Sequence, residues 1–370
     1  MDINKFINTI IEGDTIKNLK RLPDESIDFI FADPPYYMQT EGELLRVDGT
    51  KFKGVEDKWD KFKDFKDYDD FTKKWLKECK RVLKKDATIA VIGSFQNIYR
   101  IGNIMQDLGY WILNDIIWKK TNPVPNFSGK RFCNSHETIL WCSKNKKSKI
   151  TFNYKTMKYL NNEKQEKSIW EISLCTGNER LKDKNGNKLH SSQKPEKLLY
   201  KLLISATKPK DIILDPFFGT GTTGAVAKEI GQNYIGIEKE KVYVEAAEKR
   251  IASKNYQRSL ITELTLEEKP PKVPVKKLLE KGYLQKNQEL YNSLGEKKGI
   301  VLEDGNIFDG IETLSIHKMS AKLLNKTNNN GWDYFYIIEK GNLISLNDLR
   351  YRYDKEGDYV YSKMGTKSYF

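Results

Sequence analysis

Two short apolar runs, each followed at once by an acid and a proline, constrain the fold of this chain more than any other feature. The first, residues 27–32, leads into the sequence Asp-Pro-Pro-Tyr at 33–36, and the second, residues 212–214, leads into Asp215. Apolar runs of this length are typical of buried strands, and a proline prevents a strand from continuing. Both acids should therefore lie at the carboxyl ends of strands, where open α/β sheets bind their ligands.

The tetrapeptide at 33–36 contains the groups that a difficult nucleophile needs. The lone pair of an amino group on a nucleobase is delocalised into the ring, so this nitrogen attacks electrophiles poorly. Asp33 and the carbonyl of Pro34 can each accept one of its N–H groups, so that catalysis rests on positioning and electrostatics. Tyr36 offers an aromatic face on which an extruded base can stack. Asp33, Pro34, Pro35 and Tyr36 are thus candidate catalytic residues, although they equally suit a turn that ends a strand.

A glycine-rich loop follows the second apolar run. Gly219, Gly221 and Gly224 have the spacing G-x-G-x-x-G, which lets the backbone approach a ligand at a helix N-terminus. A helical pattern and a strand over 233–237 come next, and the strand ends at Glu238. An acid at about this separation binds a ribose hydroxyl in dinucleotide folds. Alone, this unit also suits a nicotinamide or flavin cofactor.

Asp215 changes the choice of cofactor. A carboxylate before the glycines would repel a pyrophosphate, but it suits the ammonium group of an amino acid. A ligand with a ribose for Glu238 and an ammonium group for Asp215 is S-adenosylmethionine. Its carboxylate would then meet the amides and hydroxyls around Thr220 and Thr222.

With these motifs the chain resembles the β class of amino-group DNA methyltransferases, in which Asp-Pro-Pro-Tyr precedes the glycine loop. Aspartate at the head of the motif resembles the adenine-N6 branch rather than the cytosine-N4 branch. The segments 13–14, 118–123 and 192–195 agree with the class. The resemblance implies that Asp14 lies near the adenine of the cofactor and Lys194 near its methionine end.

Phe217 completes the candidate cofactor residues. For Asp14, Lys194 and Phe217 the ordinary alternatives are a Gly-Asp turn, a solvated lysine and a core phenylalanine.

Three stretches, 34–42, 122–126 and 313–336, resemble the HinfI-type members, which methylate the adenine of GANTC. This resemblance implies transfer of a methyl group to adenine N6 in double-stranded DNA, with base flipping and no covalent enzyme intermediate, within a restriction-modification system. The candidate DNA-binding residues are Gln39, Asn126, Lys130, Arg131, Asn330 and Trp332.

Each of these DNA-binding candidates has a simpler interpretation. Lys130 and Arg131 are equally compatible with solvation, and Trp332 with core packing. The Asn-Gly pair in 328–332 predicts a turn between strands. Residues 54–60 suit either a flap over DNA or a solvated loop, and His136 is typical of a polar residue at a strand start.

Other functions stay open from sequence alone. The same chemistry on cytosine N4 or on RNA, a catalytically silent DNA-binding module, and a nicotinamide oxidoreductase are the alternatives.

Composition agrees with a DNA-binding enzyme. The chain of 370 residues carries a formal net charge of +13, and such a length predicts two domains. Basic charge favours a polyanionic partner, although it also occurs on solvated surfaces. Four cysteines without Cys-x-x-Cys spacing and three histidines predict no metal site. No apolar segment suits a signal peptide or a membrane span, so we expect a cytoplasmic, nucleoid-associated protein. A near-palindromic target would suit a homodimer.

Apolar runs and helical patterns alternate along the first part of the chain, which predicts a doubly wound, Rossmann-like α/β methyltransferase sheet. Further strands are expected at 88–92, 112–118 and 137–142, and helices at 68–83 and 97–108.

The predicted domain plan has three parts. Residues 1–262 form the methyltransferase domain, with a target-recognition insertion at about 120–190, and 263–274 form a proline- and charge-rich linker. Residues 275–370 form a small α+β DNA-binding domain. Within the insertion, four aromatic residues suggest that part of it orders against DNA: Phe152, Tyr154, Tyr159 and Trp170.

Overall fold

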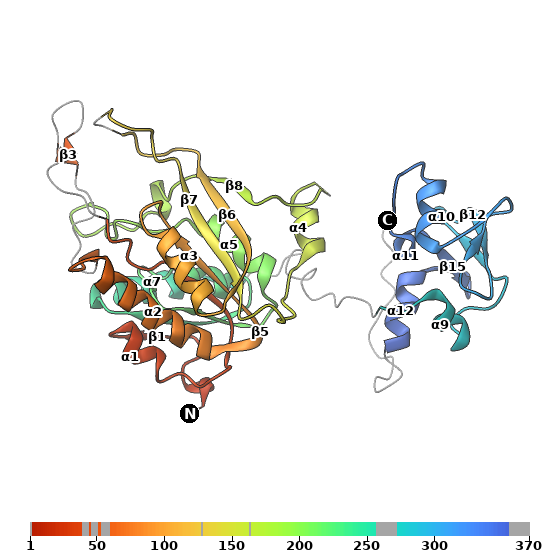
Figure 1. Ribbon diagram of the computed structural model, residues 1–370, viewed down its shortest axis with the longest axis horizontal. Coiled ribbons are helices and arrows are strands. Elements are labelled where there is room, and N and C mark those ends of the chain that lie inside the picture. Colours follow the sequence, from red (N-terminus) through yellow and green to blue (C-terminus); the bar gives the residue numbers. More distant parts are fainter. Residues whose placement is uncertain are drawn as a thin grey trace. The chain divides into compact units, whose positions relative to one another are not determined.

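The computed structural model describes residues 2–38, 44–45, 51–52, 60–126, 129–162, 164–256 and 272–354 (Figure 1). The chain divides into two compact units, Met1–Glu267 and Glu268–Phe370. Each unit is described by itself.

An eight-stranded sheet forms the centre of the first unit, in the order β1-β10-β9-β2-β5-β7-β6-β8. Strand β7 runs antiparallel to both of its neighbours, and the other neighbouring pairs are parallel. The strands are β1 (Thr9–Glu12), β2 (Ile27–Ala32), β5 (Leu83–Gly93), β6 (Trp111–Lys120), β7 (His136–Ser143), β8 (Ile169–Ile172), β9 (Ile212–Asp215) and β10 (Asn233–Glu238). The sequence predicted six of these strands and missed β1 and β8, both only four residues long.

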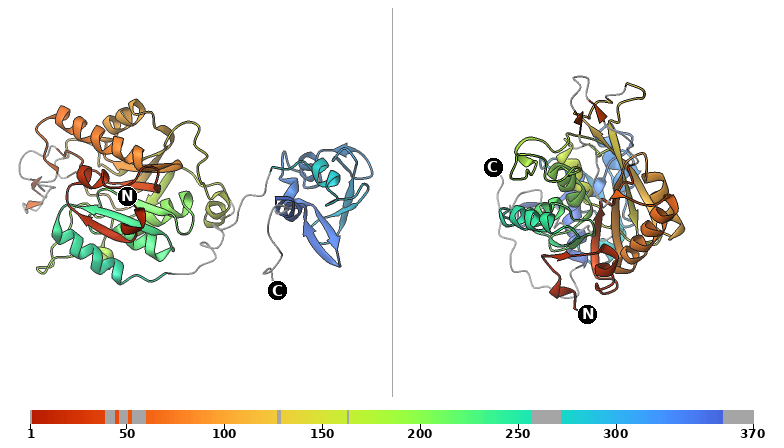
Figure 2. Two further views of the ribbon diagram at one scale, coloured as in Figure 1. Left: turned by 90° about the horizontal axis from the view of Figure 1, so that it is seen from below. Right: turned by 90° about the vertical axis from the view of Figure 1, so that its left-hand side faces the viewer.

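Helices cover both faces of this sheet (Figure 2). One face packs against α1 (Thr15–Leu19), α2 (Phe65–Val82) and α3 (Ile98–Asp107), and the other against α5 (Glu196–Ala206), α6 (Thr222–Glu229) and α7 (Lys241–Ala252). Within β2, Ile30 packs on the first side while Phe29 and Phe31 pack on the second. Burial on both faces explains the uninterrupted apolar run. The structure thus confirms the doubly wound α/β fold.

Smaller elements complete the first unit. They are η1 (Ile3–Lys5), β3 (Leu44–Leu45), β4 (Lys51–Phe52), α4 (Tyr154–Leu160) and η3 (Gly177–Glu179).

Two strands within the predicted insertion belong to the central sheet. β7 lies between β5 and β6, and β8 pairs with β6. Trp170 of β8 is buried in the core beneath α5, so it orders its segment by packing rather than against DNA. Tyr154 and Tyr159 are exposed.

The second unit is an α+β domain with a six-stranded antiparallel sheet, in the order β14-β13-β12-β11-β15-β16. Its core includes Leu278, Met319, Phe335 and Leu349. The elements are α9 (Val275–Glu280), β11 (Glu289–Tyr291), β12 (Lys297–Val301), β13 (Ile307–Phe308), β14 (Thr313–Leu314), α10 (Ile316–Leu323), α11 (Gly331–Tyr334), β15 (Tyr336–Glu339), β16 (Asn342–Ser345) and α12 (Leu346–Asp354).

The predicted turn between strands at 328–332 is wrong. Asn330 instead caps α11, and its side-chain oxygen accepts the N–H of Trp332. A Cβ on Gly331 would collide with the carbonyl oxygen of Ile316. Close approach of two helices, rather than hairpin geometry, therefore explains the Asn-Gly pair.

Over the described ranges, no helix is long and apolar enough to cross a membrane. The same residues include no group of three or more His, Cys, Asp or Glu side chains that could hold a metal ion. Cys79, Cys133, Cys142 and Cys175 are free thiols.

Candidate active site

Strands β2 and β9 are neighbours, and from them the chain proceeds in opposite directions across the sheet, to β5 and to β10. Such a reversal opens a crevice at the carboxyl ends of the two strands. A cavity of about 290 Å³ lies there. Its lining includes all of the predicted catalytic and cofactor residues except Gly221: Asp14, Asp33, Pro34, Pro35, Tyr36, Lys194, Asp215, Phe217, Gly219, Thr220, Thr222 and Glu238.

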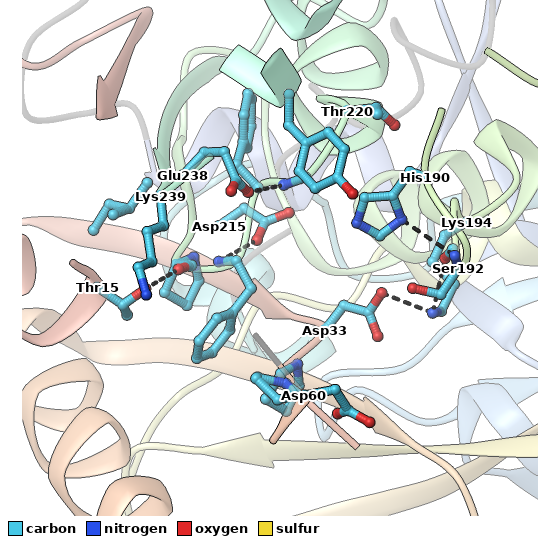
Figure 3. A pocket seen from close by; sticks show the side chains of 18 of the residues that line it. Thr15, Asp33, Asp60, His190, Ser192, Lys194, Asp215, Thr220, Glu238 and Lys239 are labelled. Carbon is cyan, nitrogen blue, oxygen red and sulfur yellow. Dashed lines mark hydrogen bonds and ion pairs between the residues drawn. The ribbon is translucent and has the colours of Figure 1, made fainter. Parts of the chain in front are cut away.

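Asp33 follows β2 directly and lies in this cavity (Figure 3). Its Oδ2 accepts a hydrogen bond of 2.7 Å from the ammonium group of Lys194. Its buried Oδ1 has no hydrogen-bond partner in the part of the chain that the structure describes. Burial raises the pKa of Asp33, and the charge of Lys194 counteracts this rise. A buried oxygen without a partner is costly, so Oδ1 is suited to accept a hydrogen bond from a bound molecule.

A second buried carboxylate, Glu137 at the start of β7, holds Tyr36. The Tyr36 hydroxyl donates to Glu137 Oε2 at 2.9 Å, and Lys120 Nζ lies 2.7 Å from Oε1. The ammonium group of Lys194 lies 5.1 Å from the centre of the Tyr36 ring and 3.9 Å from Glu137 Oε2. Burial opposes ionisation of Glu137, but Lys194 and Lys120 outweigh it and lower its pKa. Around Tyr36, the carboxylates of Asp33 and Glu137 are thus balanced by the ammonium groups of Lys194 and Lys120.

Lys194 stays charged in this network. Burial alone would lower its pKa, but Asp33 and Glu137 outweigh burial and raise the pKa of Lys194 above its ordinary value. The paired charges explain how an ammonium group persists in a buried position.

The two proline carbonyls of the loop differ in their partners. The Pro35 carbonyl accepts hydrogen bonds from the Tyr68 hydroxyl at 3.0 Å and from Asn97 Nδ2 at 3.4 Å. Burial raises the pKa of Tyr68 to about 12, so this hydroxyl remains a donor. The Pro34 carbonyl receives no hydrogen bond from the residues of the structure described above. It is left for a ligand beside Asp33.

Asp215 occupies the second half of the cavity, at the end of β9 (Figure 3). Its Oδ1 accepts the N–H of Phe217 at 2.9 Å, and its Oδ2 accepts the hydroxyl of Thr223 at 2.6 Å. Burial raises its pKa to about 7, although both hydrogen bonds oppose the rise. A bound ammonium group next to this buried carboxyl would favour its ionised form.

Glu238 joins the glycine loop to the end of β10. Its two oxygens accept the N–H groups of Gly219 at 2.7 Å and of Glu240 at 2.8 Å. Burial raises the pKa of Glu238 despite these hydrogen bonds. Gly221 caps α6 with φ of 76° and packs against Ala247, where a Cβ would lie 2.6 Å from the alanine Cβ. Gly221 therefore shapes the loop without lining the cavity.

Asp14 and His190 close the two sides of the cofactor half. Asp14 caps α1 through the N–H of Lys17 and lines the cavity. The His190 ring packs on Tyr243 at 4.7 Å and lies beside Gly219. Burial, together with the nearby cations, lowers the pKa of His190 to about 3, so the ring is neutral. No local sequence pattern predicts His190 as a site residue.

Asp60 also lines the cavity, and its carboxylate accepts the N–H groups of Tyr36, Tyr37 and Met38. In the sequence Asp60 belongs to the charged segment 54–60, and no local pattern predicts it as a site residue. The same holds for Glu137, which follows the candidate polar residue His136. Since side chains alternate along a strand, the exposed His136 and the buried Glu137 point in opposite directions.

In the first unit, the candidate DNA-binding residues Asn126, Lys130 and Arg131 are not among the residues that line this cavity. Lys130 and Arg131 are exposed, and the Arg131 guanidinium lies 5.5 Å from the centre of the Phe95 ring. Asn126 Nδ2 donates to the Arg131 carbonyl at 2.7 Å. Gln39 lies outside the described residues.

In the second unit, Asn330 is exposed, whereas Trp332 is buried in the core with the Arg350 guanidinium over its ring. The packing alternative for Trp332 is therefore the one that the structure favours.

Comparison with known proteins places the chain in a family. The profile described as DNA methylase, for N6 and N4 enzymes, matches residues 27–249. A second profile, Restriction Enzyme Adenine Methylase Associated, matches residues 262–358. The first match spans more than half of the chain, including the strands of the central sheet from β2 to β10.

Two curated relatives match over most of their lengths. The type II methyltransferase M.HinfI of Haemophilus influenzae is 63% identical over 355 residues, which are 96% of this chain and 99% of the relative. The type II methyltransferase M2.DpnII of Streptococcus pneumoniae is 43% identical over 253 residues, 68% of this chain and 91% of that protein. The solved structure of the PvuII cytosine-N4-specific DNA methyltransferase matches with a TM-score of 0.53 and 22% identity, over 70% of this chain and 90% of that one. This last likeness concerns the fold alone.

The chain belongs to the N6/N4 family of DNA methylases. Within that family it is an adenine-N6 DNA methyltransferase that uses S-adenosylmethionine, as its close relationship to M.HinfI and its site motifs indicate.

Proposed function

We propose that the enzyme flips the adenine of GANTC out of the duplex and methylates it on both strands, with residues 33–36 as the catalytic loop. The observation that carries the proposal is the buried Asp33 Oδ1, which has no partner among the described residues and lies in a cavity with the Tyr36 ring. A flipped adenine can stack on Tyr36 and donate one N6 hydrogen to Oδ1. The other hydrogen goes to the carbonyl of Pro34, which accepts no hydrogen bond from the described residues.

The charges around the loop support this role. Lys194 favours the ionised form of Asp33, and the carboxylate stabilises the positive charge that develops on N6 as the methyl group arrives. Glu137 holds the Tyr36 hydroxyl, which fixes the ring on which the base stacks. Catalysis then rests on positioning and electrostatics, because no residue forms a bond to the substrate.

The other half of the cavity fits S-adenosylmethionine, which supplies an electrophilic methyl group on a sulfonium. Burial raises the pKa of Asp215, and a methionine ammonium group beside it would stabilise its ionised form, which supports this assignment. Glu238 would bind the ribose hydroxyls, and Asp14 would lie near the adenine. Thr220 and Thr222, with Lys194 and Phe217 close by, would receive the methionine end, and the Gly219 backbone allows close approach.

The GANTC target rests on 63% identity to M.HinfI over almost the whole chain, including the stretches outside the cofactor site. Plasmid DNA methylated in vitro should resist an endonuclease that GANTC adenine methylation blocks. Mass spectrometry of the digested DNA should find N6-methyladenine. Complete cutting, with the methyl label in another sequence, would refute the specificity and leave the chemistry intact. N4-methylcytosine instead would refute the adenine target.

We propose further that the second unit contacts DNA. It matches a profile named for association with adenine methylases. A cleft in this unit is lined by the basic or polar side chains of Lys272, Lys276, His317 and Arg350, and Asp304 is the one acidic residue among the described residues that line it. In the first unit, Asn126, Lys130, Arg131 and Gln39 are the proposed contacts. Asn330 is exposed beside α11 and stays a candidate.

A near-palindromic target suits a homodimer, and a chromosomal substrate places the enzyme in the cytoplasm on the nucleoid. Sedimentation with and without a GANTC duplex tests the dimer, and a monomer under both conditions would contradict it.

A further inference from the structure

Asp60 makes an unusual set of contacts with the catalytic loop. Its Oδ1 accepts the N–H groups of Tyr36 at 2.6 Å and of Tyr37 at 2.7 Å, and its Oδ2 accepts the N–H of Met38 at 2.8 Å. Asp60 is only 5% exposed. Successive N–H groups that converge on one point form an anion-binding concavity, and here a carboxylate of the same chain fills it.

The backbone conformation of the loop explains why such an anchor is needed. Tyr37 has φ of 51°, in the left-handed region that bulky residues rarely adopt. Its ring packs edge-on against Phe62 and Phe65 and stacks on Tyr68, at 5.6, 5.3 and 5.9 Å between centroids. This turn points the backbone N–H groups toward Asp60. Charge-assisted hydrogen bonds to the backbone are stronger than neutral ones, so the carboxylate offsets the strain of the turn.

The anchored turn lies next to the reacting groups. Tyr36 is both a donor to Asp60, through its backbone, and the ring on which the base is proposed to stack. Pro35, one residue earlier, is held through its carbonyl by Tyr68 and Asn97. The loop is therefore held both through the Pro35 carbonyl and through the N–H groups of residues 36–38. Among the described residues, Asp60 is the only acid that accepts hydrogen bonds from these N–H groups.

We propose that Asp60 is a positioning residue for methyl transfer: it holds residues 36–38 in the turn that places Tyr36 and Asp33 for the target adenine. It acts through the backbone and does not itself touch the amino group. The inference rests on the proposed role of residues 33–36. Asp60 is far from this loop in sequence, since its partner Met38 lies 22 positions away, so the contact is a tertiary one.

The variant Asp60→Asn tests the proposal with little change of shape. An amide offers one acceptor oxygen instead of two and presents N–H groups toward the N–H of Met38. We expect kcat on a GANTC duplex to fall on the order of 10²-fold, the cost of a small misplacement of reacting groups. The Kd for S-adenosylmethionine should change less than about threefold. Hydrogen exchange at the amides of residues 36–38 should become faster.

Asp70→Asn is the matched control, because Asp70 is an exposed acid of α2 and the substitution changes the net charge equally. It should leave kcat and amide exchange unchanged. Asp60→Asn with wild-type kcat, or with unchanged exchange at 36–38, would overturn the proposal. A rise in KM for DNA at constant kcat would instead show that Asp60 contacts the substrate directly. Asp33→Ala, assayed in parallel, separates the two hypotheses: if it stays active, the role of residues 33–36 fails whatever Asp60 does.

Discussion

At the scale of residues, we propose separate tasks for Asp33, which follows β2, and Asp215, which ends β9. Asp33→Ala should lower methyl transfer on the order of 10³-fold, because it removes the group that accepts the target amino hydrogen, while cofactor binding stays nearly intact. Asp215→Ala should raise the Kd for S-adenosylmethionine by at least about 30-fold, equivalent to roughly 2 kcal/mol for a lost buried charge partner. Titration calorimetry and single-turnover assays measure both effects. The reverse pattern would exchange the assigned roles.

Asp215 also predicts a pH dependence of cofactor affinity. Its pKa without ligand is raised to about 7, and an ammonium group binds the ionised form. Protons therefore compete with the cofactor, so affinity should be constant above about pH 7.5 and fall up to about tenfold per pH unit below 7. Asp33 and Glu238, whose pKa values are also raised, titrate in the same cavity. Asp215→Asn isolates the effect, because it should bind more weakly but with a flatter profile. An equal slope in both proteins would assign the titration to another group.

Much of the site was predictable at this scale because each motif is contiguous in sequence. Asp33 and Asp215 each follow an apolar run, and both line the cavity. Glu137 and Asp60 could not be found in this way, because their partners lie 101 and 24 positions from them along the chain. Only the fold brings these side chains together, and nothing in their neighbouring residues distinguishes them from surface acids.

At the scale of elements, the glycine loop is held by tight packing around Phe218. This ring stacks on Tyr234 at 5.9 Å, and a Cβ at Gly236 or Gly224 would come within 2.5 or 2.6 Å of it. Gly236→Ala should therefore lower the free energy of unfolding by about 1–3 kcal/mol, a typical cost of overpacking. Urea denaturation measures the change.

The combination with Phe218→Leu serves as the control for this packing. In the background of the smaller side chain, the cost of Gly236→Ala should shrink, since the clash is gone. Equal costs in both backgrounds would show that Phe218 does not set the requirement for glycine.

Strands of the central sheet were predictable where both of their faces are buried, because burial on both faces produces a run of apolar residues. The predicted strands 88–92 and 137–142 lie within β5 and β7, where consecutive apolar residues such as Ile139 and Leu140 pack on opposite faces of the sheet. The Asn-Gly pair before Trp332 failed as a hairpin signal, because glycine there meets a tertiary need, the close approach to Ile316. A local pattern cannot show which of these two needs a glycine serves.

At the scale of the whole molecule, we predict that the first unit binds the cofactor and catalyses methyl transfer, and that the second unit contributes to DNA binding. The cavity is formed entirely by residues of the first unit, between Asp14 and Tyr243, whereas the second has its own core. A chain that ends at Lys269 should therefore fold and bind S-adenosylmethionine with unchanged affinity. Its affinity for a GANTC duplex should fall by about tenfold or more.

The salt dependence of DNA binding shows whether the second unit holds the DNA backbone. Each neutralised phosphate contributes about 0.9 to the slope of log K against log salt. If the second unit makes three such contacts, the truncated chain should have a slope shallower by about 2.7. Fluorescence anisotropy over a range of NaCl concentrations measures both slopes, and calorimetry with the cofactor confirms that the truncated chain is folded. Equal slopes with full methyl transfer would refute the assignment of DNA binding to residues 275–370, because the phosphate contacts would then all come from the first unit.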